Sequence, residues 1–371
     1  MTQPIRVLHV IDSLDAGGAQ AALFNLVRHC DTARFEPSVA TMHGRGVLWD
    51  DFARLGVPLH SLSPRRELPL YVPRFAGIVR SLRPQIVHCH LYGSNWVAKP
   101  LAAALGVPVR ISHDHCSDAL RYENQWARAV DAQANRFSSH ICAVSGSIRD
   151  FLLRQERISG DRISLVYSGV DLDRFRAFTG KSRPVDAHFT VLGVGRLMPQ
   201  KGFTAYLKVA ALLLSEGCRM RFQIAGAGPN EEVLRMKAAA LGISASVEFL
   251  GHVDDMPNLY GGADALLVPS RFRGTPMAVL EAMAMRLPIV ASRMDGLAEV
   301  LVEDTDALLA SPGDIPAFAR QLRRLVDEPG LDTRLADSAL KKVRDHFSAR
   351  AMISQVEGIY GRCLEEAADR R

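Results

Sequence analysis

The chain has 371 residues, more than one hydrophobic core usually holds, so its length predicts two domains. Apolar residues make up 48% of the sequence and charged residues 23%, which excludes an intrinsically disordered protein. The net charge of +5 arises wholly within residues 1–180, where 21 cationic side chains stand against 16 anionic ones. An acidic substrate or an anionic membrane surface would suit this excess, but a mildly basic domain with neither partner fits it slightly better. No basic tail with interleaved aromatic residues points to nucleic acid.

Six cysteines are widely spaced and form no CxxC pair, which predicts reduced thiols in a cytoplasmic protein. The strand-like run VLHVI begins at residue 7, so we expect no secretory signal peptide. No apolar stretch reaches the roughly 18 residues that a membrane span needs, so contact with the inner face of the membrane would be peripheral. Arginines at positions 65, 66, 74, 80 and 83 would provide such a contact, although a solvated helix face explains them better.

Strand-like and helix-like segments alternate through the first half of the chain. The apolar run at 5–11 is typical of a buried parallel strand, and a helical pattern at 19–30 follows it. Gly17 and Gly18 lie between them, where the lack of a side chain would let a phosphate approach the backbone, although such a pair is usually only a turn. Further strands are predicted at 37–41, 57–62, 85–91, 107–112, 140–145 and 163–169. This alternation predicts a parallel sheet with helices on both faces and ligands at the carboxyl ends of the strands.

A break in the pattern predicts the domain boundary. Residues 175–188 combine Gly, Pro, Ser and charges without periodicity, and we place a linker at 179–187. The strand–helix alternation then resumes at 189. We therefore predict an α/β protein with two doubly wound domains, 1–178 and 188–350, and a final helix, 351–371, that packs toward the first domain.

The segment from 265 to 284 is predicted to form a strand, a turn and a helix. Thr275 is a candidate N-cap and Pro276 suits the first helical position. A helix that begins here directs its free amide groups and its positive dipole end toward the crevice beyond the strand, which suits phosphate. Glu281 lies near the same crevice and could accept hydrogen bonds from sugar hydroxyls. A solvated glutamate on an amphipathic helix explains this segment equally well.

Two further loops carry candidate ligand-binding residues. Arg196 and Lys201 follow the strand that begins at 189, where a planar guanidinium and a mobile ammonium could neutralise a diphosphate. As isolated residues, both would more often be solvent-exposed. Gly226 and Gly228 follow the next strand, and they would either let a nucleotide approach the backbone or form an ordinary turn.

Several motifs occur in one order along nearly the whole chain: LHVIDSLDAGGAQ, AVSGSIRDFL, ISLVYSGVDLDRF, GRLMPQKG, AGAGP, FLGHVDDMPNLYGGADALLVPS, GTPMAVLEAMAMRLPIVAS and DGLAEV. In order and spacing they resemble family 4 retaining glycosyltransferases. That resemblance implies the GT-B fold, in which two Rossmann-like domains face a cleft. It also implies a nucleotide-sugar donor held mainly by the second domain and a sugar or lipid-linked acceptor held mainly by the first.

The resemblance also assigns roles by position. Arg196 and Lys201 would act in catalysis on the diphosphate, and Glu281 would bind the ribose. Backbone amides at 277–279 would bind phosphate or sugar. The candidates on the donor side are Gly226, Gly228, Thr275, Pro276, Met277, Ala278, Val279 and Glu281; Gly17 and Gly18 would lie opposite, and Glu299 is a further cleft candidate.

One position departs from the family pattern. The family has a glutamate eight residues before the position of Glu281, and this chain has Arg273 there. Arginine donates hydrogen bonds to hydroxyls but cannot accept them, so sugar recognition must be rearranged. One hypothesis is that Arg273 selects an acidic donor sugar such as a uronic acid. A competing hypothesis is that it marks reduced or lost transfer.

Two pairs of histidines, each with a cysteine beside it, stand at strand ends: His88 and His90, then His113 and His115. Residues two apart share one side of an extended chain. Zinc could bind such a set, but the spacing matches no closed zinc pattern and the resembled family uses no protein-bound metal, so we predict no metal site. By resemblance, His115 would reach the transferred sugar or the acceptor, with His113 as the second choice. His88 could simply be a buried, hydrogen-bonded residue.

The prediction for function is a metal-independent hexosyltransferase without a cofactor, acting in the synthesis of cell-surface polysaccharide or glycolipid. Retaining glycosidases use two carboxylates about 5 Å apart, and no such pair is evident. The resemblance instead implies front-face substitution, in which the departing diphosphate accepts the acceptor's proton. Two alternatives stay open: a nucleotide-sugar-binding protein with impaired catalysis, and a sugar epimerase on the same scaffold.

Overall fold

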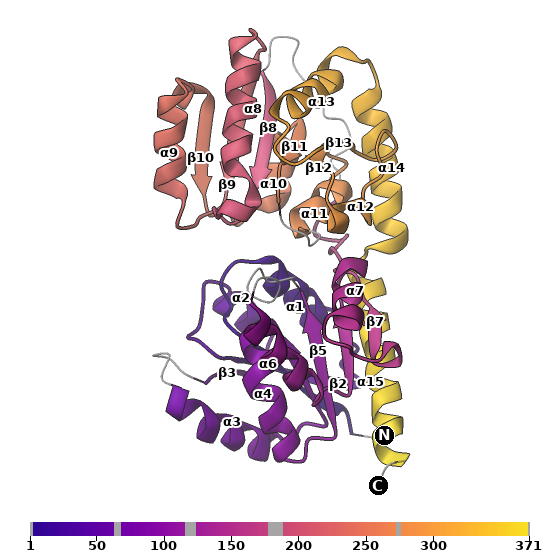
Figure 1. Ribbon diagram of the computed structural model, residues 1–371. Helices are drawn as coiled ribbons and strands as arrows, with labels where there is room; N and C mark the ends of the chain where they lie inside the picture. Colours follow the sequence, from indigo (N-terminus) through magenta and orange to yellow (C-terminus); the bar gives the residue numbers. More distant parts are fainter. Residues whose placement is uncertain (1–2, 63–67, 116–123, 177–187, 272–275, 370–371) are drawn as a thin grey trace. The chain divides into compact units, whose positions relative to one another are not determined.

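The computed structural model of the chain describes residues 3–62, 68–115, 124–176, 188–271 and 276–369 (Figure 1). Contacts divide the chain into two compact units, Met1–Gly169 with Ala349–Arg371, and Val170–Ser348. The linker predicted at 179–187 lies outside the described residues. Residues 170–176, which were predicted to end the first domain, belong to the second unit.

The first unit is built on a parallel sheet of seven strands in the order β3-β2-β1-β4-β5-β6-β7. The strands are β1 (Ile5–Ile11), β2 (Phe35–Thr41), β3 (Leu59–Ser61), β4 (Ile86–His90), β5 (Val109–Asp114), β6 (His140–Ala143) and β7 (Ile163–Leu165). Strand β1 pairs with both β2 and β4, so the direction of strand order reverses between β1 and β4. Open α/β sheets bind ligands at the carboxyl ends of the strands at such a point.

Helices cover both faces of this sheet. Val356 and Ile86 share the hydrophobic core of one face, and Phe75 and Val87 share the core of the other. The helices of the unit are α1 (Gly18–Arg28), α2 (Trp49–Arg54), α3 (Leu68–Leu82), α4 (Tyr92–Ala104), α6 (Gln125–Asn135), α7 (Gly146–Arg154) and α15 (Ala349–Asp369). Helix α15 is the last helix of the chain, and its packing on the first unit confirms the prediction (Figure 1).

The second unit has a parallel sheet of six strands in the order β10-β9-β8-β11-β12-β13. The strands are β8 (Phe189–Val194), β9 (Met220–Ala225), β10 (Val247–Gly251), β11 (Ala265–Val268), β12 (Ile289–Ser292) and β13 (Leu308–Ala310). The helices are α8 (Phe203–Ser215), α9 (Glu231–Ala240), α10 (Met256–Gly262), α11 (Met277–Ala284), α12 (Asp295–Ala298), α13 (Ile315–Asp327) and α14 (Leu331–His346). The order reverses between β8 and β11, which places the ligand-binding edge at the ends of these two strands.

Both units therefore have the predicted doubly wound α/β architecture. One boundary in the first unit differs from the prediction in a way that matters for the site. Strand β5 was predicted to end at residue 112, but it extends to Asp114 because its backbone continues to pair with β4 and β6. His113 is consequently a sheet residue that lies beside His90 in the register. None of the described helices is both long enough and apolar enough to cross a membrane.

Candidate functional site

The candidate site of the second unit is the carboxyl edge of its sheet, where backbone hydrogen bonds join neighbouring loops. The amide of Gly195 donates to the carbonyl oxygen of Ala225 at 3.0 Å, which joins the loops after β8 and β9. The amide of Arg271 donates to the carbonyl oxygen of Gln200 at 2.8 Å, which joins the loops after β11 and β8. The three loops thus form one connected backbone surface.

Glycines allow these loops to approach so closely. A Cβ atom on Gly202 would lie 1.9 Å from the carbonyl oxygen of Pro269, and one on Gly226 would lie 2.1 Å from that of Gly195. Both residues also have positive φ angles, 75° and 137°. A Cβ atom on Gly228 would lie 2.6 Å from a carbonyl oxygen of the loop after β8. Loop packing therefore requires these glycines, and the approach of a nucleotide to Gly226 and Gly228 stays a prediction.

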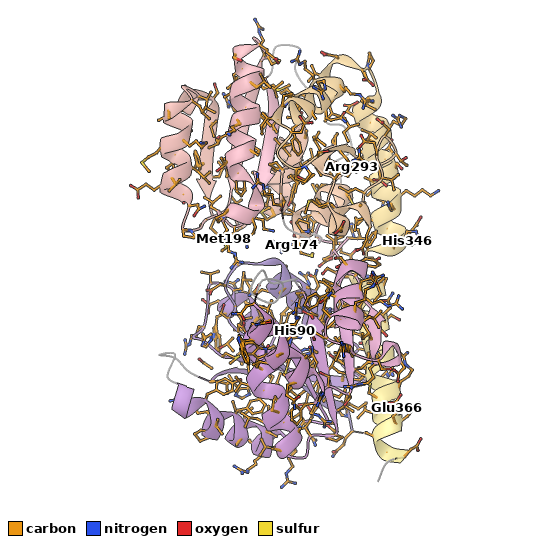
Figure 2. All side chains as sticks on the ribbon, in the orientation of Figure 1. His90, Arg174, Met198, Arg293, His346 and Glu366 are labelled. Carbon is orange, nitrogen blue, oxygen red and sulfur yellow. The ribbon has the colours of Figure 1, made fainter. Side chains whose placement is uncertain are left out.

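The two cationic candidates of this unit lie on the loop that follows β8. Arg196 is exposed, and Lys201 is partly buried at the end of a short 3₁₀ helix, Pro199–Lys201. The methylene groups of Lys201 lie 3.7 to 3.9 Å from the position of a Cβ atom on Gly195, so its stem runs along the glycine edge. Met198, labelled in Figure 2, lies on the same loop. Both charges are thus carried by the loop that the neighbouring strand ends hold in place.

Glu281 is held by a tyrosine that the sequence analysis did not single out. Tyr260, on α10, is only 1% exposed, and its hydroxyl donates a hydrogen bond of 2.7 Å to Oε2 of Glu281. Burial raises the pKa of Glu281, and the hydrogen bond from Tyr260 and the charge of Arg174 act against this rise. Oε1 of Glu281 has no hydrogen-bond partner among the described residues, so it is the oxygen available to a ligand.

Arg174, labelled in Figure 2, is close enough to Glu281 for its charge to lower the pKa of that carboxyl group. Its guanidinium lies 5.3 Å from the ring centroid of Phe175 and donates to the carbonyl oxygen of Asp254 at 3.3 Å. Phe175 in turn contacts Tyr260 edge to face, with ring centroids 6.1 Å apart. The only sequence signal for Arg174 was its place in the motif ISLVYSGVDLDRF, where its charge had no visible partner.

Helix α11 begins beside this edge, but with a different start from the predicted one. Pro276 occupies the N-cap with extended φ and ψ of −67° and 136°, one residue before the first helical position predicted for it. The amide of Val279 donates to the carbonyl oxygen of Pro276 at 3.0 Å. Of the three predicted phosphate-binding amides, Val279 is therefore engaged within the helix, and those of Met277 and Ala278 are the better candidates.

The remaining candidates of the second unit are less informative. Arg273 and Thr275 lie outside the described residues. Glu299 is partly exposed and follows the short helix α12.

The first unit offers its own edge, at the ends of β1 and β4. Gly17 is the N-cap of α1 and Gly18 its first residue, and both are exposed. Asp12 follows β1, and its carboxylate accepts hydrogen bonds from the backbone amides of Gly93 and Ser94 at 3.2 and 2.7 Å, which caps helix α4. The glycine pair thus lies where the prediction placed it, and the capping role of Asp12 was missed because its partners are about eighty residues away.

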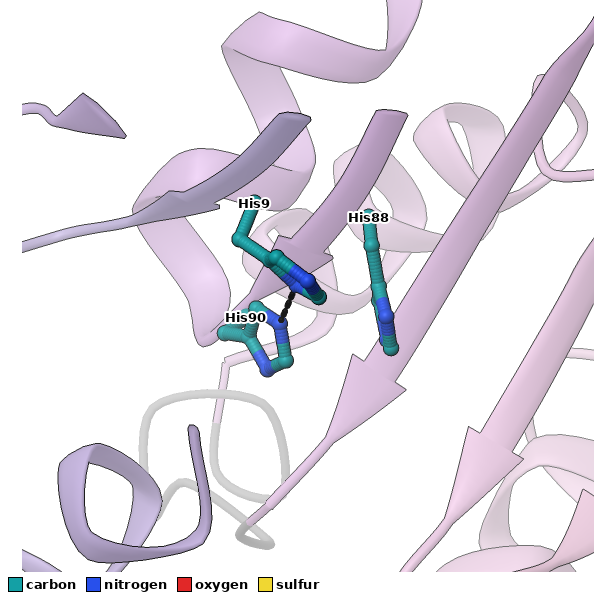
Figure 3. Close-up of side chains that lie close together, drawn as sticks. All are labelled: His9, His88 and His90. Atoms are coloured by element: carbon teal, nitrogen blue, oxygen red, sulfur yellow. Dashed lines mark hydrogen bonds between the residues drawn. The ribbon is translucent and has the colours of Figure 1, made fainter. Parts of the chain in front are cut away.

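Five imidazole rings gather on the ends of β1, β4 and β5. Nδ1 of His9 lies 3.1 Å from Nε2 of His90 (Figure 3), and Nδ1 of His90 lies 3.0 Å from Nε2 of His115. The ring of His113 stacks on that of His115 with centroids 4.3 Å apart. His88 donates to or accepts from the hydroxyl of Tyr360 on α15 at 2.6 Å. His9 is the member of this cluster that sequence reasoning missed.

Burial keeps these rings neutral. It lowers the pKa of His9 and of His115 to about 3, and it lowers the pKa of His88, His90 and His113 well below the ordinary value. The neighbouring imidazoles of the cluster lower most of these pKa values further, because each would repel a second positive charge. At neutral pH, each ring therefore carries one proton and one nitrogen lone pair.

The sequence matches two family models, one for each half of the chain. A model described as Glycosyltransferase Family 4 matches residues 16–174, and one described as Glycosyl transferases group 1 matches residues 188–328. The chain belongs to glycosyltransferase family 4. The glycosyltransferase is 27% identical over 295 residues to alpha-D-kanosaminyltransferase from Streptomyces kanamyceticus, a match that covers 74% of this chain and 76% of that protein.

Solved structures show the fold of the glycosyltransferase. Anabaena HepE in complex with UDP and glucose matches with a TM-score of 0.82 at 19% identity, covering 96% of this chain and 99% of that one. Sucrose-phosphate synthase from Thermosynechococcus elongatus matches with a TM-score of 0.84 at 18% identity, covering 98% and 100%. The two Rossmann-like units are therefore those of a GT-B glycosyltransferase.

Only some of the residues predicted on the donor side are shown to lie together at one edge of the second sheet. Arg196, Lys201, Gly226 and Gly228 lie on loops that are hydrogen-bonded to one another or in direct contact. Glu281 is oriented by Tyr260 and Arg174, which are additions to the predicted set. Their roles toward a donor belong to the proposal that follows.

Proposed function

We propose that this glycosyltransferase moves a hexosyl group from a nucleoside diphosphate sugar to a hydroxyl acceptor, with retention of the anomeric configuration. The observation that carries the proposal is the position of Arg196 and Lys201 on one loop at the ligand-binding edge of the second sheet. The solved complexes of HepE with UDP and glucose support a nucleotide donor for a protein of this fold. No cofactor is part of the proposal.

The chemistry follows from the charges at this edge. The bond between the anomeric carbon and the diphosphate oxygen breaks, and the acceptor oxygen bonds to the same face of the sugar. The acceptor's proton passes to the departing diphosphate. Arg196 and Lys201 stabilise the negative charge that develops there, which in this proposal replaces a divalent cation. Oε1 of Glu281 accepts hydrogen bonds from the ribose, and the amides of Met277 and Ala278 bind phosphate or sugar.

His115 and Gly17 belong to the acceptor side of this proposal. His115 is partly exposed at the end of β5, where the acceptor or the transferred sugar would meet it. The exposed N-terminus of α1 at Gly17 and Gly18 offers backbone groups without side chains to the same substrates. We place the acceptor among the hydroxyl groups of cell-surface polysaccharide or glycolipid precursors, because the excess positive charge of residues 1–180 suits an anionic surface.

Replacing Lys201 with alanine tests the proposal. We expect kcat/KM to fall about 100-fold or more with a donor that the wild-type protein turns over, because one stabilising charge on the leaving group is lost. The melting temperature should change little, since Lys201 is only partly buried. The matched control is Lys208→Ala, at an exposed position on α8, which should keep full activity. Unchanged transfer by Lys201→Ala would contradict the diphosphate assignment.

A second experiment tests the role of Arg273 through the charge of the donor sugar. We expect the wild-type protein to prefer an acidic nucleotide sugar, because a guanidinium attracts a carboxylate, and Arg273→Glu to shift the preference toward neutral sugars. Transfer rates measured for both proteins with neutral and acidic donors give the comparison. Turnover of neutral donors alone by the wild type would rule out the acidic-sugar hypothesis. Donor binding without turnover in any acceptor screen would instead favour a binding protein.

A further inference from the structure

One face of the first sheet carries apolar side chains near the amino ends of its strands and imidazoles near their carboxyl ends. Toward the amino ends this face carries apolar side chains, as at Ile86 and Ile111, which pack in the core with α15. Two residues further along each strand the same face carries His88 and His113. The change repeats on β1, where His9 follows Val7 on that face. A row of aliphatic residues is thus replaced by imidazoles at the ligand-binding edge of the sheet.

Several nitrogens of these imidazoles are buried without hydrogen bonds. His113 is 1% exposed, and neither of its ring nitrogens has a partner among the described residues. His88 is fully buried, and its Nε2 is also without a partner among them. Buried polar atoms are normally satisfied, and an exception often marks a site for an ion or a water molecule. Packing alone would be served better by the aliphatic residues found at the other end of these strands.

The nitrogens of His90, His113 and His115 converge. One ligand nitrogen from each ring lies within 4.8 Å of those of the other two. Nδ1 of His90 and Nε2 of His115 are already 3.0 Å apart. Zinc–nitrogen bonds of about 2.0–2.1 Å in a tetrahedron place two ligand nitrogens roughly 3.3 Å apart, so this pair needs only a small adjustment. The ligand nitrogen of His113 lies within 4.8 Å of the other two, so it would have to approach by at most about 1.5 Å.

His9 contacts the other ring nitrogen of His90, Nε2. If Nε2 of His90 carries the proton, it donates to Nδ1 of His9 at 3.1 Å, and the lone pair of His90 Nδ1 then points toward the other two rings. Metal-bound histidines commonly donate their second N–H to such an acceptor, which fixes the ring and its tautomer. His9, His88 and His90 form a second group of converging nitrogens, and the His9–His90 contact within it is the one that supplies this support (Figure 3).

We propose that His90, His113 and His115 bind a divalent transition-metal ion of the zinc class, with its fourth position open to water or another oxygen ligand. Imidazole is a preferred ligand of such ions, and three histidines with an open position are a known zinc arrangement. His115 is partly exposed, which provides a route for the ion from solvent. Cys89, considered as a ligand from the sequence, packs in the core of the opposite face, and Cys116 lies outside the described residues, so the ligands that the structure describes are histidines.

The proposed site differs from the sequence-based prediction of no metal site, and it does not depend on which sugar is transferred. The test uses the full, untagged chain, freed of metal by a chelator and titrated with Co²⁺ and then Zn²⁺ in the absence of any donor. We expect one Co²⁺ per chain, with the strong visible absorption of tetrahedral cobalt, and its loss when Zn²⁺ is added. An absence of stoichiometric binding would overturn the proposal.

Variants locate the ion. His113→Ala and His115→Gln should each abolish the visible cobalt spectrum, and His9→Gln should weaken binding 10–100-fold, on the order expected for loss of an outer-shell partner. His140→Gln, on neighbouring strand β6, is the matched control and should bind cobalt normally, because its Nε2 is bonded to Ser164 at 2.8 Å. If His113→Ala fails to fold, the partly exposed His115→Gln still decides. A cobalt spectrum unchanged in His115→Gln would exclude this site.

Discussion

At the scale of single residues, the carboxylate of Glu281 shows how a fold tunes a group that the sequence can only locate. Its helix position was evident from the motif GTPMAVLEAMAM. Its environment was not, because Tyr260 and Arg174 come from segments 21 and 107 residues away. Burial raises the pKa of Glu281, while the Tyr260 hydroxyl and the Arg174 charge hold it down. An ionised carboxylate is the stronger acceptor of hydrogen bonds from a ribose, so these two neighbours support the proposed role.

The substitution Tyr260→Phe removes one of these two influences on Glu281, the hydrogen bond from the tyrosine hydroxyl. Because the hydrogen bond from Tyr260 lowers the pKa of Glu281, its loss should raise that pKa further. As the pH is lowered, the affinity of the variant for a nucleotide sugar should therefore begin to fall at a higher pH than the affinity of the wild-type protein does. Calorimetric titration with one UDP-sugar between about pH 5 and pH 8 measures this, since its diphosphate does not titrate there.

The matched control is Tyr71→Phe in the first unit. The Tyr71 hydroxyl is buried and has no hydrogen-bond partner among the described residues, so its removal should leave nucleotide binding as in the wild type. Superimposable pH profiles for Tyr260→Phe and the wild type would show that the tyrosine does not control Glu281.

At the scale of elements, a buried lysine joins three helices of the first unit. Nζ of Lys99, on α4, donates to Oδ1 of Asn135 at the end of α6 at 2.5 Å and to Oγ of Ser138 at 3.1 Å. Nδ2 of Asn135 donates in turn to Glu156, which follows α7, at 2.6 Å. Burial lowers the pKa of Lys99, and the charges of Asp131 and Glu156 act in the opposite direction. The network fixes α6 and α7 against α4 by polar contacts.

Lys99→Met should therefore destabilise the protein strongly. Removing one member of a buried charged network typically costs about 3–5 kcal/mol, since the partners are left buried and unpaired. Urea unfolding followed by circular dichroism gives the free energy of unfolding. Lys208→Met, at an exposed position of α8, should change it by less than about 0.5 kcal/mol. Similar losses in the two variants would mean that the Lys99 network contributes little.

At the scale of the whole molecule, charge and connectivity distinguish the two units. Residues 1–180 carry the whole positive excess of the chain, and residues 349–371 return to the same unit as α15. Tyr360 of α15 contacts His88 in the sheet, so the C-terminal helix supports the histidine cluster directly. Parts of the chain that are more than 250 residues apart thus meet in the first unit, at the side of the sheet that carries the histidine cluster.

The charge excess leads to a prediction about membranes. Vesicles with anionic lipid should bind the protein more than neutral vesicles, and salt should weaken that binding because it screens exposed charges. Arg80→Glu with Arg83→Glu, both at exposed positions at the end of α3, should reduce co-sedimentation. Arg219→Glu with Arg221→Glu makes the same charge change at exposed positions of the second unit and should have a smaller effect. Equal losses would show that only net charge matters, and no binding would remove the proposed membrane contact.

Much of the architecture was accessible from the sequence for a physical reason. Buried parallel strands are continuous apolar runs, as at Ile5–Ile11 and Ala265–Val268, and helices show their own periodicity between them, so element type follows from local pattern. Glycine motifs after strands located the loops of the second unit. The strand end at Asp114 was missed because pairing with two neighbouring strands, which local pattern does not report, extends β5.

The sequence by itself thus determined the two doubly wound units, the family, the loop that carries Arg196 and Lys201 and the helix that carries Glu281, because each is written in consecutive residues. The tertiary structure decided which side chains meet. Strand order places His9 beside His88, although the two residues are 79 positions apart in the sequence, and loop packing explains Gly202 and Gly226. Contacts across sequence depend on topology and register, and those are set by the packing of the whole unit.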